Sequence, residues 1–445
     1  MKSQDKKGSP APAQSTPPPK KTSESEGFPA INRRLFLRKS AALAGSAVVG
    51  GMWAPSALRA AETNLPPNTP EWMKSQGQPI LSPAYGVPSK FEDQVVRRPT
   101  DLTPTDLSSW SFTPLQDLHG IITPNGLVFE RHHGGVPAID PDQHRLMIHG
   151  LVDRPLIFTM DDLMRFPAVS WLRFLECSGN TLTEWKAPKE KTVQFTHGLL
   201  SCCEWTGVPL STILQEVGVK PEGKWILAEG ADAAAMTRSI PIEKAWDDAL
   251  LCYAQNGEAL RPEQGYPLRL LLPGFEGNTQ IKWLRRLEVG DAPYMTREET
   301  SKYTDIMPNG KARQFSLIME AKSVITQPSG GHTLAKKGFQ EIRGLAWSGY
   351  GRIRRVDVST DGGKTWRKAE LDDPVLPRCL TRFRIPWDWD GGPAMLQSRA
   401  IDERGYVQPT LDQLRAERGL NSVYHYNAIQ TWKVAEGGEV TNVHA

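Results

Sequence analysis

The chain has few cysteines, and none has the spacing of a common metal centre. Its five Cys include no Cys-x-x-Cys pair for zinc or an iron–sulfur cluster, and no Cys-x-x-Cys-His for attached haem. His-Glu-x-x-His and Gly-x-Gly-x-x-Gly are also missing, which leaves zinc-protease and dinucleotide chemistry without support. Residues 218–224 have phosphate-loop spacing, but Trp225 stands where a magnesium-binding hydroxyl is required. A redox cofactor would therefore be held by scattered residues.

Net charge is also low, and most of the positive excess lies at the beginning of the chain. The first 60 residues carry ten of the 53 Lys/Arg and three of the 50 Asp/Glu, which leaves 43 basic and 47 acidic residues. Because nucleic-acid binding needs a basic surface, we expect no nucleic-acid partner.

No apolar run is long enough to span a membrane. The longest, over residues 41–55, has about 15 residues, against the roughly 20 that a spanning helix needs. It follows Arg33-Arg34 and precedes small residues near position 60. This layout predicts a twin-arginine signal over residues 1–60 and export to the periplasm as a folded protein, with no membrane span in the exported form. That route favours a cofactor-bearing redox enzyme.

The rest of the chain is predicted to form an arm and two domains. Residues 61–110 are rich in proline and polar residues, which indicates an extended arm. Residues 111–315 mix both element types: we expect strands at 145–150 and 269–272, a helix start at Thr159, and helices at 199–205, 209–217 and 241–250. This mixture predicts an α+β domain.

After residue 316, short strands alternate with turns. Alternating apolar residues at 353–358 precede the turn Asp361-Gly362-Gly363, and further strands are expected at 381–386, 396–401 and 428–434. Several short strands in about 130 residues predict an immunoglobulin-like β-sandwich over residues 316–445.

Cys177 is the sharpest chemical candidate. It ends the apolar run 171–175 and is followed by Ser178-Gly179-Asn180, so its thiolate would stand at a strand end. A soft thiolate suits a transition metal, although a lone cysteine in this setting is more often a structural thiol.

Basic residues elsewhere favour the metal. Arg131-His132-His133, Arg269 and Lys282 lie next to Gly- or Pro-rich segments, as an anionic, phosphate-bearing cofactor requires. Each alone is more simply a solvated surface group, but with Cys177 they predict a metal–organic cofactor.

These motifs resemble those of the sulfite oxidase family of molybdenum enzymes, over about residues 111–445. The shared segments are Arg131-His132-His133, Cys177-Ser178-Gly179-Asn180, Gly265-Tyr266-Pro267-Leu268-Arg269, Ile281-Lys282-Trp283-Leu284 and Asp361-Gly362-Gly363-Lys364-Thr365-Trp366. The resemblance implies a molybdopterin-binding catalytic domain over 111–315, followed by a β-sandwich dimerisation domain over 316–445. It also implies a molybdenum–molybdopterin cofactor, with no haem in this chain.

The resemblance assigns roles to eight residues, with Cys177 as the only protein ligand of molybdenum. The implied cofactor-binding residues are Cys177, Ser178, His133, Arg269 and Lys282. The implied catalytic residues of the substrate pocket are Tyr303, Arg131 and Trp205.

Three positions depart from the family pattern. Leu182 and His425 stand where the family has pocket arginines, and Gln264 stands where it has a histidine. A charge-assisted contact to an oxyanion contributes roughly 1.5–3 kcal/mol, so two losses would weaken sulfite binding by about two to four orders of magnitude. The pattern resembles the branch of molybdenum subunits of sulfane dehydrogenases in bacterial thiosulfate oxidation. It then implies oxygen-atom transfer to sulfane sulfur on a carrier protein, with electrons passing to a c-type cytochrome.

Two other functions stay open. One is a sulfite:cytochrome c oxidoreductase, and the other is a metal-free periplasmic scaffold or binding protein. The resemblance further implies a homodimer through the second domain, with a cytochrome subunit on each half. We expect Cys202, Cys203, Cys252 and Cys379 to be mostly buried thiols, with a bridge from Cys252 to Cys202 or Cys203 as the alternative.

Overall fold

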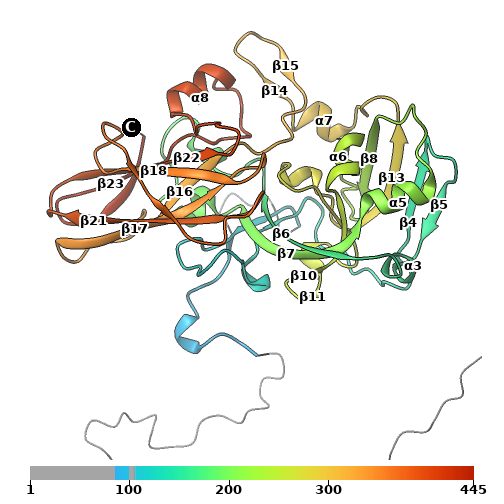
Figure 1. The fold of residues 1–445 in the computed structure, drawn as a ribbon, viewed down its shortest axis with the longest axis horizontal. Coiled ribbons are helices and arrows are strands. Elements are labelled where there is room, and N and C mark those ends of the chain that lie inside the picture. The colour runs from blue at the N-terminus through green and yellow to red at the C-terminus, as the bar shows by residue number, and fades with distance from the viewer. Residues whose placement is uncertain (1–85, 100–104, 106, 445) are drawn as a thin grey trace, which may run out of the picture. The chain divides into compact units, whose positions relative to one another are not determined.

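The computed structural model describes residues 86–99, 105 and 107–444 (Figure 1). The predicted export signal, residues 1–60, and most of the predicted arm, 61–110, lie outside the described residues. From Pro88 onward the chain forms one unit, which includes both predicted domains. None of the helices in the described ranges is both long and apolar enough to cross a membrane.

The described end of the arm joins a small three-stranded sheet. After the short 3-10 helix η2 (Lys90–Glu92), strand β1 (Arg98–Pro99) pairs with β2 (Trp110–Phe112), and β2 pairs with β3 (Glu130–Arg131). Strand β3 therefore carries the first of the predicted basic residues, Arg131.

The first domain contains two five-stranded sheets and short helices, which confirms the α+β class. One sheet has the order β11-β10-β7-β6, with β12 paired to β10, and the other has the order β5-β4-β13-β8-β9. The strands of the first are β6 (Val169–Glu176), β7 (Leu200–Pro209), β10 (Leu250–Gln255), β11 (Glu258–Ala259) and β12 (Arg269–Leu271). The strands of the second are β4 (Leu146–Gly150), β5 (Leu156–Phe158), β8 (Trp225–Gly230), β9 (Thr237–Pro241) and β13 (Leu284–Gly290). The helices are α3 (Met160–Met164), α4 (Val193–His197), α5 (Leu210–Val217), α6 (Ile242–Asp247) and α7 (Arg297–Ser301).

Local sequence signals account for several of these elements. Helix α3 begins after Thr159 with a complete capping box, in which Asp162 and Thr159 satisfy each other's backbone N–H groups. Helix α5 buries the apolar side chains of one of its faces. The helix ends at Gly218, whose backbone has a positive φ that would strain any residue with a side chain. The strands expected at 145–150 and 269–272 are β4 and β12, and the helices expected at 209–217 and 241–250 are α5 and α6.

The helix predicted at 199–205 is wrong, because this segment begins strand β7. The strand pairs antiparallel with β6 over its length, from Val169 opposite Gly207 to Glu176 opposite Leu200. Most residues of β7 are buried on both faces of the sheet. A doubly buried strand is a continuous apolar run, and its period does not distinguish it from a buried helix.

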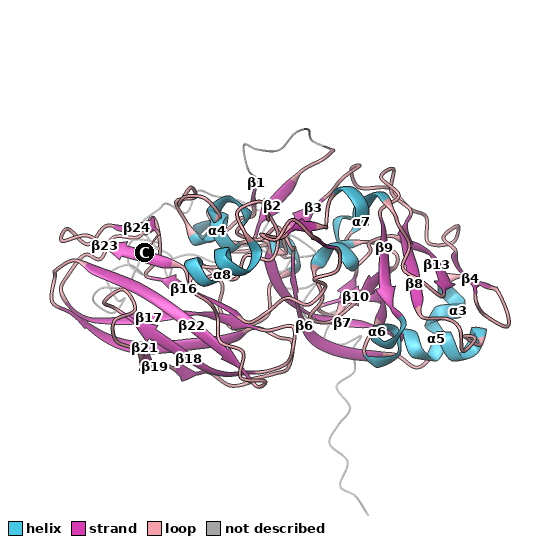
Figure 2. Cartoon of the chain, turned by 90° about the horizontal axis from the view of Figure 1, so that it is seen from above, coloured by secondary structure: helices cyan, strands magenta, loops and turns pink. Residues whose placement is uncertain are grey.

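The second domain is the predicted β-sandwich. Its sheets have the orders β16-β17-β21-β20 and β19-β18-β22-β23-β24 (Figure 2). The first comprises β16 (Lys322–Gln327), β17 (Gly338–Trp347), β20 (Glu370–Leu371) and β21 (Thr381–Trp389). The second comprises β18 (Ile353–Ser359), β19 (Arg367–Lys368), β22 (Ala394–Asp402), β23 (Thr431–Val434) and β24 (Val440–Val443). A hairpin of β14 (Asp305–Ile306) and β15 (Ala312–Arg313) precedes this domain, and helix α8 (Leu411–Arg418) lies within it.

The predicted turn at Asp361-Gly362-Gly363 connects β18 to the returning strand β19. Gly362 and Gly363 both have positive φ, which glycine adopts without strain. The Asp361 carboxylate accepts hydrogen bonds from the backbone N–H and the hydroxyl of Thr365, which closes the turn.

The two domains share one hydrophobic core. Phe174 of β6 and Leu200 and Cys202 of β7 belong to the same buried cluster as the interior of the sandwich, including Trp347 and Trp432. Figure 2 shows β6 and β7 running between the sandwich and the remainder of the first domain. The strand that leads to Cys177 is therefore packed on one side against the second domain.

Candidate active site

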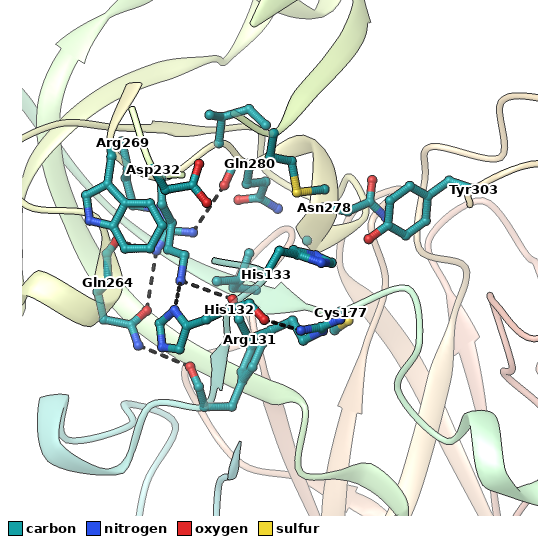
Figure 3. A pocket seen from close by; sticks show the side chains of 17 residues that line it. Arg131, His132, His133, Cys177, Asp232, Gln264, Arg269, Asn278, Gln280 and Tyr303 are labelled. Atoms are coloured by element: carbon teal, nitrogen blue, oxygen red, sulfur yellow. Dashed lines mark hydrogen bonds between the residues drawn. The ribbon is translucent and has the colours of Figure 1, made fainter. Parts of the chain in front are cut away.

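One pocket gathers side chains from distant parts of the first domain (Figure 3). Six predicted site residues line it: Arg131, His133, Cys177, Arg269, Lys282 and Tyr303. In Figure 3, Arg269 and Gln264 are grouped at one end, with Cys177 and Tyr303 toward the other. The pocket therefore has a basic end and a thiol end.

Cys177 is positioned by the end of β6. Its backbone N–H donates to the carbonyl of Leu199 at 3.0 Å, and its carbonyl accepts from Asn180 at 2.9 Å. A Cβ on Gly277 would lie 2.8 Å from the carbonyl oxygen of Glu176, so only glycine lets the neighbouring loop approach here. The sequence correctly predicted a thiol presented at a strand end.

Burial raises the pKa of the Cys177 thiol, while the charge of Arg131 acts in the opposite direction. In the metal-free chain this thiol keeps its proton, and a bound cation is needed to stabilise the thiolate. A buried thiol of this kind can serve as a ligand only when a metal ion is bound beside it.

The basic end of the pocket has cations without carboxylate partners. Arg269 is 2% exposed, and its Nη1 donates to the carbonyl of Gln264 at 2.9 Å, while its buried Nε has no partner. The Nζ of Lys282 donates to the carbonyls of Arg131 (3.1 Å) and Glu263 (3.0 Å). Neither cation is in an ion pair with any carboxylate of the described residues.

The histidines of this end are neutral. Burial and the charge of Lys282 lower the pKa of His132 to about 3. Desolvation and the charges of Arg131 and Lys282 lower the pKa of His133 to about 4. Burial and the charge of Arg269 also lower the pKa of Lys282. An anion in the pocket would offset the mutual repulsion of Arg131, Arg269 and Lys282, so the residues fit a phosphate-bearing group.

The thiol end is closed by a buried charge network. Arg238 contacts Glu276 at 3.1 Å and Glu299 at 2.9 Å, and its guanidinium lies 4.7 Å from the ring centre of Tyr303. Glu276 also accepts from His425 (3.0 Å). Although burial opposes it, the charge of Arg238 and the hydrogen bond from His425 lower the pKa of Glu276 to about 2. This network holds Tyr303 beside the pocket. The charge of Arg238 is balanced by Glu276 and Glu299 and is therefore not free to bind an anion.

Trp205 does not line the pocket, so its predicted role as a pocket tryptophan is corrected. Its side chain is fully buried, and its ring lies 4.8 Å from the guanidinium of Arg269. Its Nε1 donates to the carbonyl of Arg173 at 3.2 Å. Trp205 supports Arg269 from behind.

The side chain of Ser178 does not line the pocket either. Its Oγ accepts from Asn278 at 2.8 Å, and its carbonyl accepts from the backbone N–H of His425 at 2.9 Å. These contacts order the loop after Cys177, and they join it to two other segments of the chain.

Sequence reasoning missed several residues that the structure brings to the site. Asn278, Gln280 and Asp232 line the pocket, and Glu276 and Tyr424 lie at its thiol end. Three of the five follow the Pro-Gly loop after β12, so polar residues in that loop were the available signal.

Leu182, the first departure from the family pattern, lies at the rim of the thiol end. It is 39% exposed and packs beside Gly179. A Cβ added to Gly179 would lie within 4 Å of three side chains, those of Leu182, Cys177 and Tyr424. The rim beside Cys177 thus presents apolar and aromatic groups.

The other two departures are held by partners within the chain. His425 is committed to Glu276, as described. Gln264 is buried, and its Nε2 donates to the carbonyl of Phe129 at 3.1 Å. Neither position therefore supplies a free cation to the pocket.

Comparison with known proteins gives matches over both domains. Residues 133–298 match the oxidoreductase molybdopterin binding domain, and residues 313–432 match the Mo-co oxidoreductase dimerisation domain. The chain is 31% identical to mitochondrial sulfite oxidase of Mus musculus over 380 residues, covering 79% of this chain and 69% of that protein. It is 35% identical to nitrate reductase [NADH] 2 of Phaseolus vulgaris over 315 residues, covering 62% of this chain but only 35% of that protein.

A solved structure is similar over a larger part of the chain. The sulfane dehydrogenase SoxCD from Paracoccus pantotrophus matches with a TM-score of 0.83 and 50% identity, covering 89% of this chain and all of the matched chain.

Proposed function

Since the chain belongs to the sulfite oxidase family of molybdopterin oxidoreductases, we propose that it is the molybdenum subunit of a periplasmic sulfane dehydrogenase. Its substrate is a sulfane sulfur on a carrier protein, and its electrons pass to a c-type cytochrome. The observation that carries this proposal is the rim beside Cys177, where Leu182 is apolar and His425 is already paired with Glu276. The likeness to the sulfane dehydrogenase of Paracoccus pantotrophus supports it.

Different pocket residues would bind different parts of the cofactor. Cys177 would be the protein ligand of molybdenum, while Arg269, Lys282 and His133 would hold the anionic pterin at the basic end. Bound there, the molybdenum–molybdopterin group supplies oxygen-atom transfer and two-electron redox chemistry.

The chain itself supplies orientation and charge at the thiol end. Burial and the neighbouring Cys177 and Tyr424 raise the pKa of Tyr303, so its hydroxyl keeps its proton and can donate to a substrate oxygen. Arg131 lines the same pocket and would stabilise negative charge that develops on that oxygen. Leu182 and Tyr424 would contact the thioalkyl arm of the carrier and exclude water.

Assembly and location belong to the same proposal. The match of the second domain to a dimerisation domain supports a homodimer through the sandwich. The paired arginines at residues 33–34 and the apolar segment after them support export by the twin-arginine route. A free-sulfite:cytochrome c oxidoreductase is the second candidate, favoured by the retained Arg131 and by the mammalian sulfite oxidases among the relatives.

The first test measures molybdenum and released pterin per chain in protein purified from a periplasmic fraction. We expect close to one of each per chain. Initial rates with carrier-bound sulfane sulfur and with free sulfite, using cytochrome c as acceptor, then separate the two enzyme functions. A faster reaction with sulfite would reject the sulfane dehydrogenase. Metal-free protein from cells that load another molybdoenzyme would favour the scaffold.

Replacing Leu182 with arginine is expected to improve the use of free sulfite. One new charge-assisted contact should lower the KM for sulfite roughly ten- to hundredfold, and the added charge should slow the reaction with carrier-bound sulfane. Leu182→Met is the matched control, because it keeps the size and adds no charge. An unchanged sulfite KM in Leu182→Arg would show that this position does not set the substrate preference.

A further inference from the structure

Two cysteines from different domains face each other in the interior. Cys202 lies on β7, and Cys379 lies in the loop between β20 and β21. Their Sγ atoms are 3.2 Å apart, about 1.1 Å more than the roughly 2.05 Å of a disulfide bond. Both side chains are buried, with exposed fractions of 0% and 1%.

The neighbouring cysteines have no such arrangement. Successive side chains of a strand point to opposite faces, so Cys203 points away from Cys379 although it follows Cys202 directly. The Sγ of Cys203 accepts from Nε2 of Gln255 at 3.1 Å, and Cys203 and Cys252 belong to a different buried cluster. The bridge from Cys252 that the sequence left open is not formed in the described structure, where the Sγ of Cys252 lies 3.9 Å from the carbonyl of Leu250.

The backbone on both sides of the pair is already held in place. The carbonyl of Arg378 accepts from the backbone N–H of Phe174 at 3.0 Å, and its Nη1 donates to Asp248 at 2.6 Å. Phe174 and Asp248 lie in the first domain, while Arg378 also donates to the carbonyls of Gly349 (3.2 Å) and Gly351 (2.9 Å) in the second. Cys202 is paired in register with Phe174, so the two sulfurs meet where the loop is docked on β6 and β7.

We propose that Cys202 and Cys379 form a disulfide bond that links the catalytic domain to the β-sandwich. In this reaction the two thiols lose two protons and two electrons, and a small-molecule or protein disulfide accepts them and becomes two thiols. The bond forms through a mixed disulfide, and its formation is independent of the proposed substrate.

Cys379 is the thiol that reacts first. The hydrogen bond with Cys202 lowers the pKa of Cys379. Cys379 lies in the loop between β20 and β21, whereas Cys202 lies on β7, which is paired on both sides, so fewer backbone hydrogen bonds must break to expose Cys379.

The link would join the sandwich to the strand pair that presents Cys177. Strands β6 and β7 are paired from Val169 to Glu176, and Cys177 follows immediately. Cys202 and Cys379 are 177 positions apart, so the bond would close a long loop in the unfolded chain. Loops of this length give the largest expected stabilisation on cross-linking.

The test counts thiols in the purified full-length protein. One sample is incubated with oxidised glutathione and another with a dithiol reductant, and each is then unfolded in an alkylating reagent. We expect five alkylated cysteines after reduction and three after oxidation, with one cross-linked peptide that joins Cys202 to Cys379. Five alkylated cysteines after oxidation, or a cross-link through Cys203 or Cys252, would overturn the proposal.

Variants give a second readout that does not depend on their basal stability. Within each protein, the Tm of the oxidised form is compared with that of the reduced form. We expect oxidation to raise Tm by about 5 °C in the native protein and in the control Cys252→Ala, and to leave Tm unchanged in Cys379→Ala. An equal rise in Cys379→Ala would show that oxidation acts elsewhere in the molecule.

Discussion

Replacing Cys177 with alanine is expected to abolish turnover and leave the fold intact. Cys177 is the only cysteine that lines the pocket, and its backbone is held by Leu199 and Asn180, which the substitution does not touch. Losing a hydrogen-bond partner of a metal ligand typically costs 10–100-fold in affinity or activity, so losing the ligand itself should cost at least about a thousandfold. The measurements are the steady-state rate, molybdenum per chain and Tm.

Cys203→Ala provides the matched control for this loss. It removes the same sulfur atom from a buried site three residues from the start of β7, and this thiol does not line the pocket. We expect it to retain turnover and metal while losing some stability through the small cavity. Turnover at the native level in Cys177→Ala would reject Cys177 as the metal ligand, and with it the site as described.

Replacing Lys322 with methionine is expected to destabilise the protein strongly. The Nζ of Lys322, on β16, donates to Glu176 at 3.1 Å and to Thr181 at 2.9 Å, and the exposed fractions of Lys322 and Glu176 are 1% and 0%. Trp347 also donates to Glu176, at 2.6 Å. Breaking a buried ion pair leaves an uncompensated charge, which costs about 3–5 kcal/mol of the free energy of unfolding. Denaturant unfolding measures this loss.

The double variant Lys322→Met with Glu176→Gln separates charge from packing. Because it removes both members of the pair, we expect it to regain part of the stability that the single variant loses. Glu176 directly precedes Cys177, so the single variant should also bind less molybdenum, and the double variant should bind more than the single one. A single variant as stable as the native protein, or a double variant no better than the single one, would contradict this account.

Features set by neighbours in the chain could be predicted from the sequence. The apolar run before Cys177 and the small residues after it indicate a strand end with a presented thiol, and β6 ends at Glu176. The capping box at Thr159 and the glycine turn at Asp361-Gly362-Gly363 depend on side chains within a few residues of each other. In these places the physical cause of the structure is itself local.

Features set by contacts between distant segments could not be predicted in this way. Residues 199–205 are apolar enough for a buried helix or a buried strand, and only the pairing with β6 makes them β7. Trp205 matched a pocket residue in its motif, but in the fold it packs behind Arg269. The residues of a short segment do not specify which distant segment will pack against it.

The sequence by itself determined the family and the cofactor class, because short motifs in a set order carry that information, and it predicts Cys177 as the thiol that binds the metal. Only the tertiary structure decided what surrounds that thiol. Glu176 meets Lys322 at a separation of 146 residues, and Glu276 meets His425 at 149. Such contacts arise when strands from both domains pack on one core, since burial pairs charges and thiols that are far apart along the chain.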